Sequence, residues 1–125
     1  MNTVYTKNAP DAIGPYSQAV VTNGLVFTSG QIAINPESGM VEAQTIAEQT
    51  EQVCKNIKAV LEASGSNLEN VVKTTCFLKD MADFGAFNEV YAKYFVGKPA
   101  RSCVAAKELP KNVLVEIDTV AEVAK

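Results

Sequence analysis

Residues 45–79 read TIAEQTEQVCKNIKAVLEASGSNLENVVKTTCFLK, and they predict the helix and the strand on which the rest of the fold depends. Thr45 and Glu48 form the capping-box pattern of a helix start. Apolar side chains then recur at helical spacing, at Ile46, Val53, Ile57, Val60 and Leu61. Gly65 is typical of the residue just beyond a helix end. The alternation from residue 71 to 79 predicts a strand with one side formed by Val72, Thr74, Cys76 and Leu78.

The segments on either side of this unit predict more strands and a second helix. Residues 20–28 predict a hairpin that turns at Asn23-Gly24, and residues 35–39 predict a loop. Asp80 is the candidate N-cap of a second helix, whose apolar side chains are Phe84, Phe87, Tyr91, Tyr94 and Phe95. Pro99 breaks the chain after this helix, and the last two strands are expected at Ser102–Ala106 and Val113–Val123.

The resulting order of elements, β-β-α-β-α-β-β, predicts one α+β domain that spans residues 1–125. Two helices and about six strands suit a single mixed sheet with both helices on one face. In the last strand, one set of alternating residues should face the helices: Val113, Val115, Ile117, Ala121 and Val123. The opposite set mixes Leu114 and Val120 with carboxylates, so that face looks partly covered. Because no third helix is available, we expect another copy of the chain to cover it in a closed homo-oligomer.

Length, composition and charge restrict the class of protein. With 125 residues and 47% apolar side chains, the chain is expected to be a soluble globular domain. It has no run of about eighteen apolar residues, so no membrane-spanning helix is predicted, and the first residues lack an apolar signal core, so we expect a cytoplasmic location. Cys54, Cys76 and Cys103 are odd in number and widely spaced, which favours free thiols in a reducing compartment. The net charge of −3 provides no basic field for nucleic acid.

The sequence contains no histidine, and this absence excludes several kinds of catalytic site. Ser-His-Asp and Cys-His catalysis are both ruled out, together with the commonest general base near neutral pH. A metal site would have to use scattered carboxylates and thiols, so no metal is expected. Any chemistry must therefore depend on carboxylate, tyrosine, cysteine, lysine or arginine side chains, or on the backbone.

Arg101 and Glu116 are the leading candidates for chemistry. Arg101 follows Pro99-Ala100 at a strand start, and its planar guanidinium is suited to hold a carboxylate through two parallel hydrogen bonds. The alternative is a structural arginine in a surface or interface salt bridge. Glu116 lies between Val115 and Ile117, where partial burial would raise its pKa and a nearby arginine would lower it. It is either a proton shuttle that orients water or a glutamate on an edge strand facing solvent.

Three further residues are weaker candidates. Asn88 interrupts the apolar stripe of the second helix, so it must find polar partners, either in a neighbouring loop or as a brace for a binding site. Tyr16 follows Gly14-Pro15, which presents its ring either to a pocket or to the core. Cys103 would be nucleophilic only if Arg101 lowered its pKa, and a buried, inert thiol is the favoured interpretation.

Four segments of the chain together resemble a known family. They are Ala9 to Ala19 (APDAIGPYSQA), Thr28 to Ile32 (TSGQI), Pro99 to Val104 (PARSCV), and Leu109-Pro110 through Val115-Glu116-Ile117. In this order and spacing they resemble the reactive-intermediate deaminase (Rid) family, also called the YjgF-type or translation-inhibitor-like family. The resemblance covers nearly the whole chain, and the arginine at position 101 points to the arginine-bearing, RidA-type subgroup.

The resemblance implies a chorismate-mutase-like fold and a homotrimer with ligand clefts between subunits. It also implies hydrolysis of 2-enamino and 2-imino acids, such as 2-aminoacrylate and the imines of pyruvate and 2-oxobutanoate, to 2-oxo acids and ammonia, without a cofactor. By residue-to-residue comparison, Arg101 would bind the substrate carboxylate and Glu116 would lie beside the reacting nitrogen and water. The positions implied to line or brace the cleft are Tyr16, Ser29, Gly30, Asn88 and Cys103.

One loop departs from the family pattern. Residues 95–99 form a shorter segment than in many members, and Lys98 replaces a residue that is often aromatic or proline. This difference bears on the size of substrate accepted. Two other functions stay open at this point: a trimer that binds 2-oxo acids or a partner without catalysis, and an endoribonuclease or translation inhibitor, which the acidic net charge disfavours.

Overall fold

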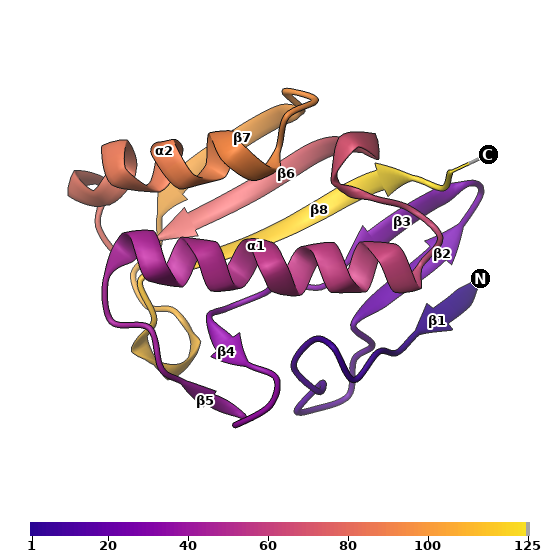
Figure 1. The fold of residues 1–125 in the computed structure, drawn as a ribbon, viewed down its shortest axis with the longest axis horizontal. Coiled ribbons are helices and arrows are strands. Elements are labelled where there is room, and N and C mark those ends of the chain that lie inside the picture. Colours follow the sequence, from indigo (N-terminus) through magenta and orange to yellow (C-terminus); the bar gives the residue numbers. More distant parts are fainter. Residues whose placement is uncertain (125) are drawn as a thin grey trace.

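A six-stranded sheet forms one layer of the protein, and both helices pack against one of its faces (Figure 1). The computed structural model describes residues 1–124. Across the sheet the strand order is β1-β2-β3-β8-β6-β7, and within these residues β6 and β7 form the one parallel pair. The strands are β1 (Asn2–Val4), β2 (Ala19–Thr22), β3 (Leu25–Thr28), β6 (Val71–Leu78), β7 (Ala100–Ala105) and β8 (Val115–Glu122). The predicted α+β fold, a mixed sheet with two helices on one face, is confirmed.

The helices are α1 (Ile46–Ala63) and α2 (Phe84–Tyr94). The capping box of α1 is formed as predicted. The Glu48 amide donates to Thr45 Oγ1 at 3.2 Å, and the Thr45 amide donates to Glu48 Oε1 at 3.3 Å. Gly65 follows the C-terminal end of α1 with a φ of +80°, a conformation that favours glycine.

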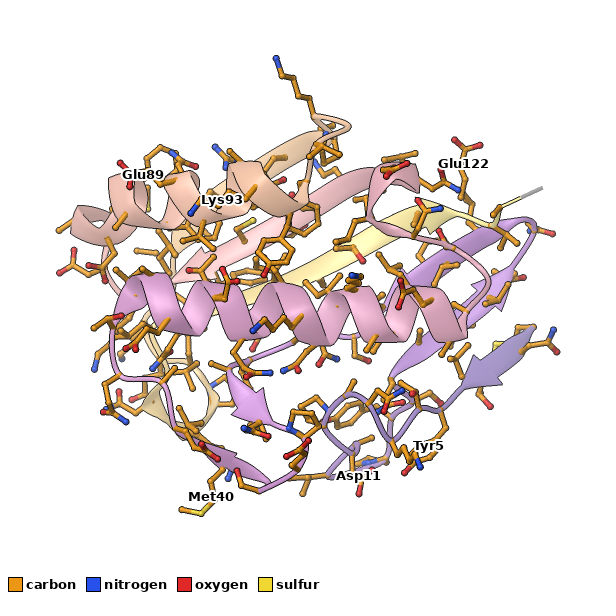
Figure 2. All side chains as sticks on the ribbon, in the orientation of Figure 1. Tyr5, Asp11, Met40, Glu89, Lys93 and Glu122 are labelled. Atoms are coloured by element: carbon orange, nitrogen blue, oxygen red, sulfur yellow. The ribbon has the colours of Figure 1, made fainter. Side chains whose placement is uncertain are left out.

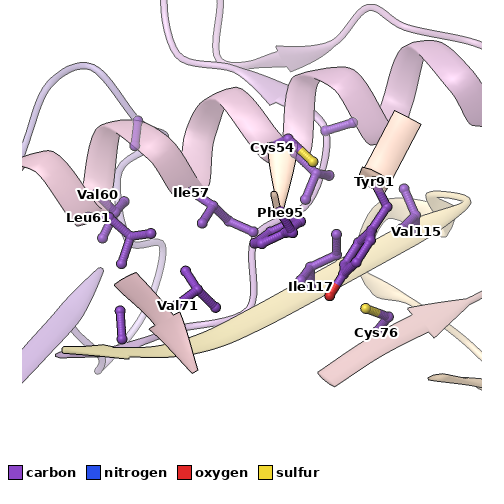
Figure 3. Close-up of a cluster of buried hydrophobic side chains, with 14 of the residues drawn as sticks. Cys54, Ile57, Val60, Leu61, Val71, Cys76, Tyr91, Phe95, Val115 and Ile117 are labelled. Carbon is purple, nitrogen blue, oxygen red and sulfur yellow. The ribbon is translucent and has the colours of Figure 1, made fainter. Parts of the chain in front are cut away.

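The core lies between the sheet and the two helices (Figure 3). Ile57 and Leu61 of α1 point toward the sheet and are fully buried, and Tyr91 of α2 points toward Ile117 of β8. Burial of one such aliphatic side chain stabilises the fold by about 1.5–3 kcal/mol. The residues of the predicted last strand that were expected to face the helices do so: Val115, Ile117 and Ala121 of β8 and Val113 just before it are buried, and Val123 just after it packs against the same core.

Two local predictions need correction, and a third was incomplete. A β-bulge between Val71 and Lys73 shifts the alternation of β6 by one residue, so Val71 is buried, whereas Val72 is exposed rather than in line with Thr74. The loop predicted at residues 35–39 is present as a turn at residues 36–39, but the two short strands that it joins, β4 (Ile34–Asn35) and β5 (Met40–Val41), were not predicted. Asp80 caps the 3-10 turn Met81–Asp83 through the Ala82 amide, and α2 begins only after that turn.

The face of the sheet opposite the helices carries exposed apolar side chains. Phe27 of β3 is 42% exposed and Val104 of β7 is 51% exposed. Phe27 pairs in register with Val20 and Val120, so these three side chains form a row across β2, β3 and β8. Hereafter we call this side of the sheet the open face. Within residues 1–124, no helix is long and apolar enough to cross a membrane.

Candidate functional site

Arg101 lies on the edge strand β7, and side chains of α2 hold its guanidinium in place. It is the second residue of β7 and pairs in register with Thr74, which is buried beneath the helices. Its Nη1 atom donates a hydrogen bond to Asn88 Oδ1 of α2 at 2.7 Å. The guanidinium carbon lies 4.8 Å from the ring centroid of Tyr91 and 5.3 Å from that of Phe84. The Asn88 amide and the aromatic rings therefore fix the orientation of the Arg101 guanidinium group.

The charge of Arg101 is not neutralised by these contacts. Arg101 is the only arginine in the sequence, and the partners named above are all neutral. It opens onto a cleft of about 540 Å³, which contains no carboxylate among its lining residues: Asn88, Tyr91, Ala92, Phe95, Val96, Lys98, Pro99 and Arg101. The Tyr91 hydroxyl is bonded to Thr74 Oγ1 at 2.7 Å, so the ring beneath the guanidinium is itself fixed. The arrangement suits a planar anion bound by a half-buried guanidinium.

Glu116 lies on the open face, on the other side of the sheet from Arg101. Its neighbours in β8, Val115 and Ile117, are buried under the helices, so the alternation of the strand turns Glu116 away from them. Its carboxylate lies against Gly30, where an added Cβ would be 2.4 Å from Glu116 Oε2. Both residues line a second cleft of about 350 Å³, together with Tyr16, Asp11 and Lys111.

The environment of Glu116 favours its protonated form. Partial burial raises the pKa of this carboxyl group above its usual value of 4.5, and the negative charge of Asp118 raises it further. Asp118 lies two residues along the same face of β8, and burial raises its pKa also, while a hydrogen bond with Thr75 opposes that shift. A carboxyl group with a raised pKa beside a cleft has the properties of a proton-transfer group.

The N-terminal segment brings Tyr16 to the Glu116 cleft. Tyr16 is 53% exposed, so it is not a core residue, and its hydroxyl accepts a hydrogen bond from the Ile13 amide at 3.3 Å. Ser29 does not line this cleft: its Oγ donates to the Ser17 carbonyl at 2.6 Å and so ties the end of β3 to this segment. The segment is also held by buried Gln18, which bonds Thr6 and Pro10 (2.7 and 2.8 Å). Figure 2 shows Tyr5 and Asp11 side by side in the same segment.

Cys103 is close to Arg101 but is not activated by it. Desolvation by burial raises the pKa of its thiol, and the positive charge of Arg101 offsets this only in part. Cys54, Cys76 and Cys103 are all free. Residues 1–124 also contain no cluster of three or more cysteine or carboxylate side chains arranged to hold a metal ion.

Within one chain, the candidate residues therefore form two separate groups. Arg101, Asn88 and Cys103 lie on the helix side of the sheet, and Glu116, Gly30 and Tyr16 surround the cleft on the open face. We call these the arginine half-site and the glutamate half-site. No residue lines both clefts.

Sequence reasoning missed the aromatic support of Arg101. Phe84, Phe87 and Tyr91 lie within 6 Å of its guanidinium carbon, measured to each ring centroid, at 5.3, 5.9 and 4.8 Å. Their helical spacing predicted a row of buried apolar side chains. The same spacing would be seen whether an aromatic ring packs on a strand or on a cation, so the contact with Arg101 could not be predicted. Asp11 and Lys111 of the glutamate half-site also carried no recognisable sequence signal.

Comparison with known proteins identifies the family. The model of a family described as Endoribonuclease L-PSP matches residues 6–123. A RutC family protein of Pyrococcus horikoshii is 51% identical over 119 residues, which cover 94% of each chain. The 2-iminobutanoate/2-iminopropanoate deaminase of Escherichia coli K12 is 46% identical over 123 residues, 95% of each chain. A crystal structure of E. coli TdcF with bound serine superposes with a TM-score of 0.93 at 38% identity, over 99% of this chain and 100% of that one.

These matches agree with the sequence motifs in covering nearly the whole chain. The chain therefore belongs to the Endoribonuclease L-PSP family, which is the YjgF-type or reactive-intermediate deaminase family that its motifs resemble.

Proposed function

We propose that this protein hydrolyses reactive 2-imino acids, and 2-enamino acids after their tautomerisation, to 2-oxo acids and ammonia. The reaction is R–C(=NH)–COO⁻ + H₂O → R–CO–COO⁻ + NH₃. The substrates in mind are small ones, such as 2-iminopropanoate, its tautomer 2-aminoacrylate, and 2-iminobutanoate. The deaminase name of the E. coli relative at 46% identity supports this class of reaction.

The observation that carries the proposal is the state of Arg101. Its guanidinium is half-buried, directed by Asn88 and Tyr91, and free of any carboxylate partner in its cleft. A structural arginine would be expected to pair with an acidic side chain, whereas this one is oriented for an external anion. The serine bound in the TdcF structure also carries a carboxylate, which supports the same role.

Glu116 supplies the proton transfers in this proposal. Water attacks the imine carbon while the Glu116 carboxylate takes one of its protons and passes it to the nitrogen, which gives a carbinolamine, R–C(OH)(NH₂)–COO⁻. Glu116 then takes the hydroxyl proton and passes it to the amino group as the C=O bond forms, the C–N bond breaks and ammonia leaves. An imine conjugated to a carboxylate is already electrophilic, so positioning of the substrate and water is sufficient and no cofactor is required. The raised pKa of Glu116 supports its role as a group that both accepts and returns a proton.

The reaction requires the two half-sites to meet, and one chain separates them by the thickness of the sheet. We infer that the chain forms a homotrimer in which the arginine half-site of one subunit faces the glutamate half-site of the next. The apolar row at Val20, Phe27 and Val120, in which Phe27 is exposed and the two valines are half-buried, supports an interface on the open face. A cyclic arrangement repeats the same contact around the ring and closes it, which gives one complete cleft at each interface. The three free thiols support a reducing compartment such as the cytoplasm.

The test couples this protein to a threonine dehydratase and follows the formation of 2-oxobutanoate. Wild-type protein should accelerate the release step, and Arg101→Ala should lose most of that acceleration, because an alanine leaves the carboxylate unanchored. Arg101→Lys should recover only part of it, because an ammonium lacks the two-pronged geometry. Saturable binding of 2-oxobutanoate by calorimetry without any acceleration would instead favour a non-catalytic binding protein.

RNA cleavage is the second candidate, because the matching family is described as an endoribonuclease. The net charge of −3 and the missing histidine weigh against it. Cleavage that persists after rigorous nuclease removal, and that disappears in Arg101→Ala or Glu116→Gln, would support this activity. Cleavage that is equal in wild type and both variants would identify a contaminant.

A further inference from the structure

We propose that Lys98 makes the arginine cleft selective for 2-imino acids whose side chain carries a second carboxylate, namely the imines of acidic amino acids. This inference rests on the deaminase function proposed above. The substrate would be ⁻OOC–(CH₂)n–C(=NH)–COO⁻, with one or two methylene groups. Its hydrolysis consumes one water and releases ammonia and the matching 2-oxo diacid, so no further reactant is needed.

The charge of the cleft is the first argument. Its lining contains two cations, Arg101 and Lys98, and no carboxylate. The glutamate half-site differs, because two carboxylates, Asp11 and Glu116, share it with the single cation of Lys111. Among the residues that one chain contributes to this cleft, a substrate with one carboxylate would use Arg101 and leave Lys98 without a carboxylate partner. A second carboxylate on the substrate would pair with it.

The conformation of the loop is the second argument. Lys98 has a φ of +52°, which lies in the left-handed region and is uncommon for lysine, and its amide donates to the Phe95 carbonyl at 3.2 Å. Phe95 is buried and stacks on Tyr91 with ring centroids 4.4 Å apart. Because Tyr91 also lies under Arg101, the base of the Lys98 side chain is fixed relative to the guanidinium.

Contacts on the other side of the loop restrict it further. A Cβ on Gly97 would lie 3.0 Å from the Glu69 carbonyl oxygen, so the loop packs closely on the segment before β6. Pro99 fixes its own φ directly after Lys98. A lysine on a constrained loop loses less conformational freedom when it binds than one on a mobile loop, which increases its contribution to specificity.

The separation of the two cations suits a short diacid. Lys98 and Arg101 are three residues apart, so their Cα atoms are at most about 11 Å apart, and both side chains are long enough to converge within that span. Lys98 is exposed, whereas Arg101 is half-buried. The 2-carboxylate would therefore bind at the deeper guanidinium, and the side-chain carboxylate would bind at the rim of the cleft.

The experiment compares two imines under the same conditions. An amino-acid oxidase generates the imine of glutamate or of 2-aminobutyrate, semicarbazide traps whatever remains, and loss of the trapped product reports turnover. For the wild-type protein, kcat/KM should favour the glutamate imine. In Lys98→Met that preference, measured as the ratio of kcat/KM for the two imines, should fall by about twofold to fivefold, the effect of one exposed ion pair. Lys98→Arg should keep the preference.

Lys93→Met is the matched control, because it removes the same charge from an exposed position of α2 that lines a different cleft. An equal fall in Lys93→Met would assign the effect to net charge and overturn the inference. An unchanged preference in Lys98→Met would overturn it too, with the deaminase function intact. If no imine is turned over, the deaminase function fails. Calorimetry with 2-oxoglutarate and 2-oxobutanoate then decides the role of Lys98, and equal affinity of Lys98→Met and wild type for 2-oxoglutarate would refute it.

Discussion

At the scale of single residues, Arg101 and Glu116 differ in how their surroundings affect the stability of their charged forms. Arg101 keeps its charge among neutral partners that fix its direction, which prepares it for an external carboxylate. Glu116 is partly buried near the like charge of Asp118, which makes its ionised form less stable than in water. In the proposed mechanism, the first group binds the substrate carboxylate and the second gains and loses a proton.

The raised pKa of Glu116 predicts where activity falls at low pH. As a base, Glu116 works in its ionised form, so kcat/KM should fall as the pH decreases through its pKa, above the usual value of 4.5. This fall is the acid limb of the pH profile. Asp118→Asn removes a like charge and lowers the pKa of Glu116, so it should move the acid limb to lower pH. Glu116→Gln should remove the limb and most of the activity. The check is a pH profile of kcat/KM in the coupled assay.

The control for this prediction is Glu122→Gln, which removes one negative charge at the exposed end of β8 (Figure 2). It should leave the acid limb where it is. An Asp118→Asn profile that coincides with that of wild type would show that Asp118 does not influence the proton-transfer group.

At the scale of elements, the glutamate half-site depends on how the chain leaves β3. Gln31 exchanges two backbone hydrogen bonds with Ile117, of 2.8 and 3.1 Å, and these hold residues 29–31 against β8. Gly30 is then pressed against the Glu116 carboxylate, so its missing side chain leaves room for that group. On the far side of the core, buried Asn56 of α1 donates to the carbonyls of Ile32 and Ile34 at 3.1 and 2.9 Å and anchors the chain after Gly30.

Gly30→Ala should therefore impair activity far more than stability. The new Cβ would be 2.4 Å from Glu116 Oε2, and the flexible carboxylate would have to move away. Displacement of a catalytic group by about 1 Å can cost roughly a hundredfold in rate, so we expect kcat/KM to fall about ten- to a hundredfold. The free energy of unfolding should change by less than about 1 kcal/mol, because a side-chain end moves and the backbone does not.

Gly85→Ala is the matched substitution for this test. Gly85 lies in α2 with no atom within 4 Å of the added Cβ, so activity should be retained. Stability should rise by roughly 0.5–1 kcal/mol, because alanine favours the helix over glycine. If thermal or denaturant unfolding shows that Gly30→Ala loses stability and activity together, the substitution disrupts the fold and the specific role of Gly30 is refuted.

At the scale of the whole molecule, the sheet separates the two half-sites and also provides the surface that would join them. The helix side is filled by the core, whereas the open face presents Phe27 and Val104 to solvent in the single chain. An exposed apolar surface beside a candidate site is typical of an interface between subunits. Assembly and activity should therefore depend on the same face of the sheet.

Phe27→Glu should prevent assembly of the proposed trimer and leave a monomer, because it places a charge in the middle of the apolar row. Light scattering should give three times the chain mass for wild type and the single chain mass for the variant. Deaminase activity should be lost with assembly, although Phe27 lines neither cleft. Met40→Glu, on the exposed β5 hairpin (Figure 2), is the control and should stay trimeric and active. A monomeric wild type at micromolar concentration would contradict the shared site.

Features that depend on neighbours along the chain could be predicted from the sequence. The capping box and spacing of α1, the Asn23-Gly24 hairpin and the alternation of β8 follow from local backbone geometry, and all three were confirmed. The bulge at Val71–Lys73 escaped prediction because β6 adjusts there to its pairing with β8, a strand more than forty residues away. The β4–β5 hairpin is so short that its composition is that of a loop.

The sequence by itself therefore determined the two helices, the main strands and the class of fold, and it singled out Arg101 and Glu116 as candidates for chemistry in a chain without histidine. Only the tertiary structure decided that Asn88 bonds Arg101, that Gly30 makes room for Glu116, and that the two half-sites lie on opposite faces of one sheet. The physical reason is the range of the interactions. Helical and strand periodicity are set by the backbone over a few residues, whereas the side-chain contacts of a site are set by the packing of segments that the sequence keeps far apart.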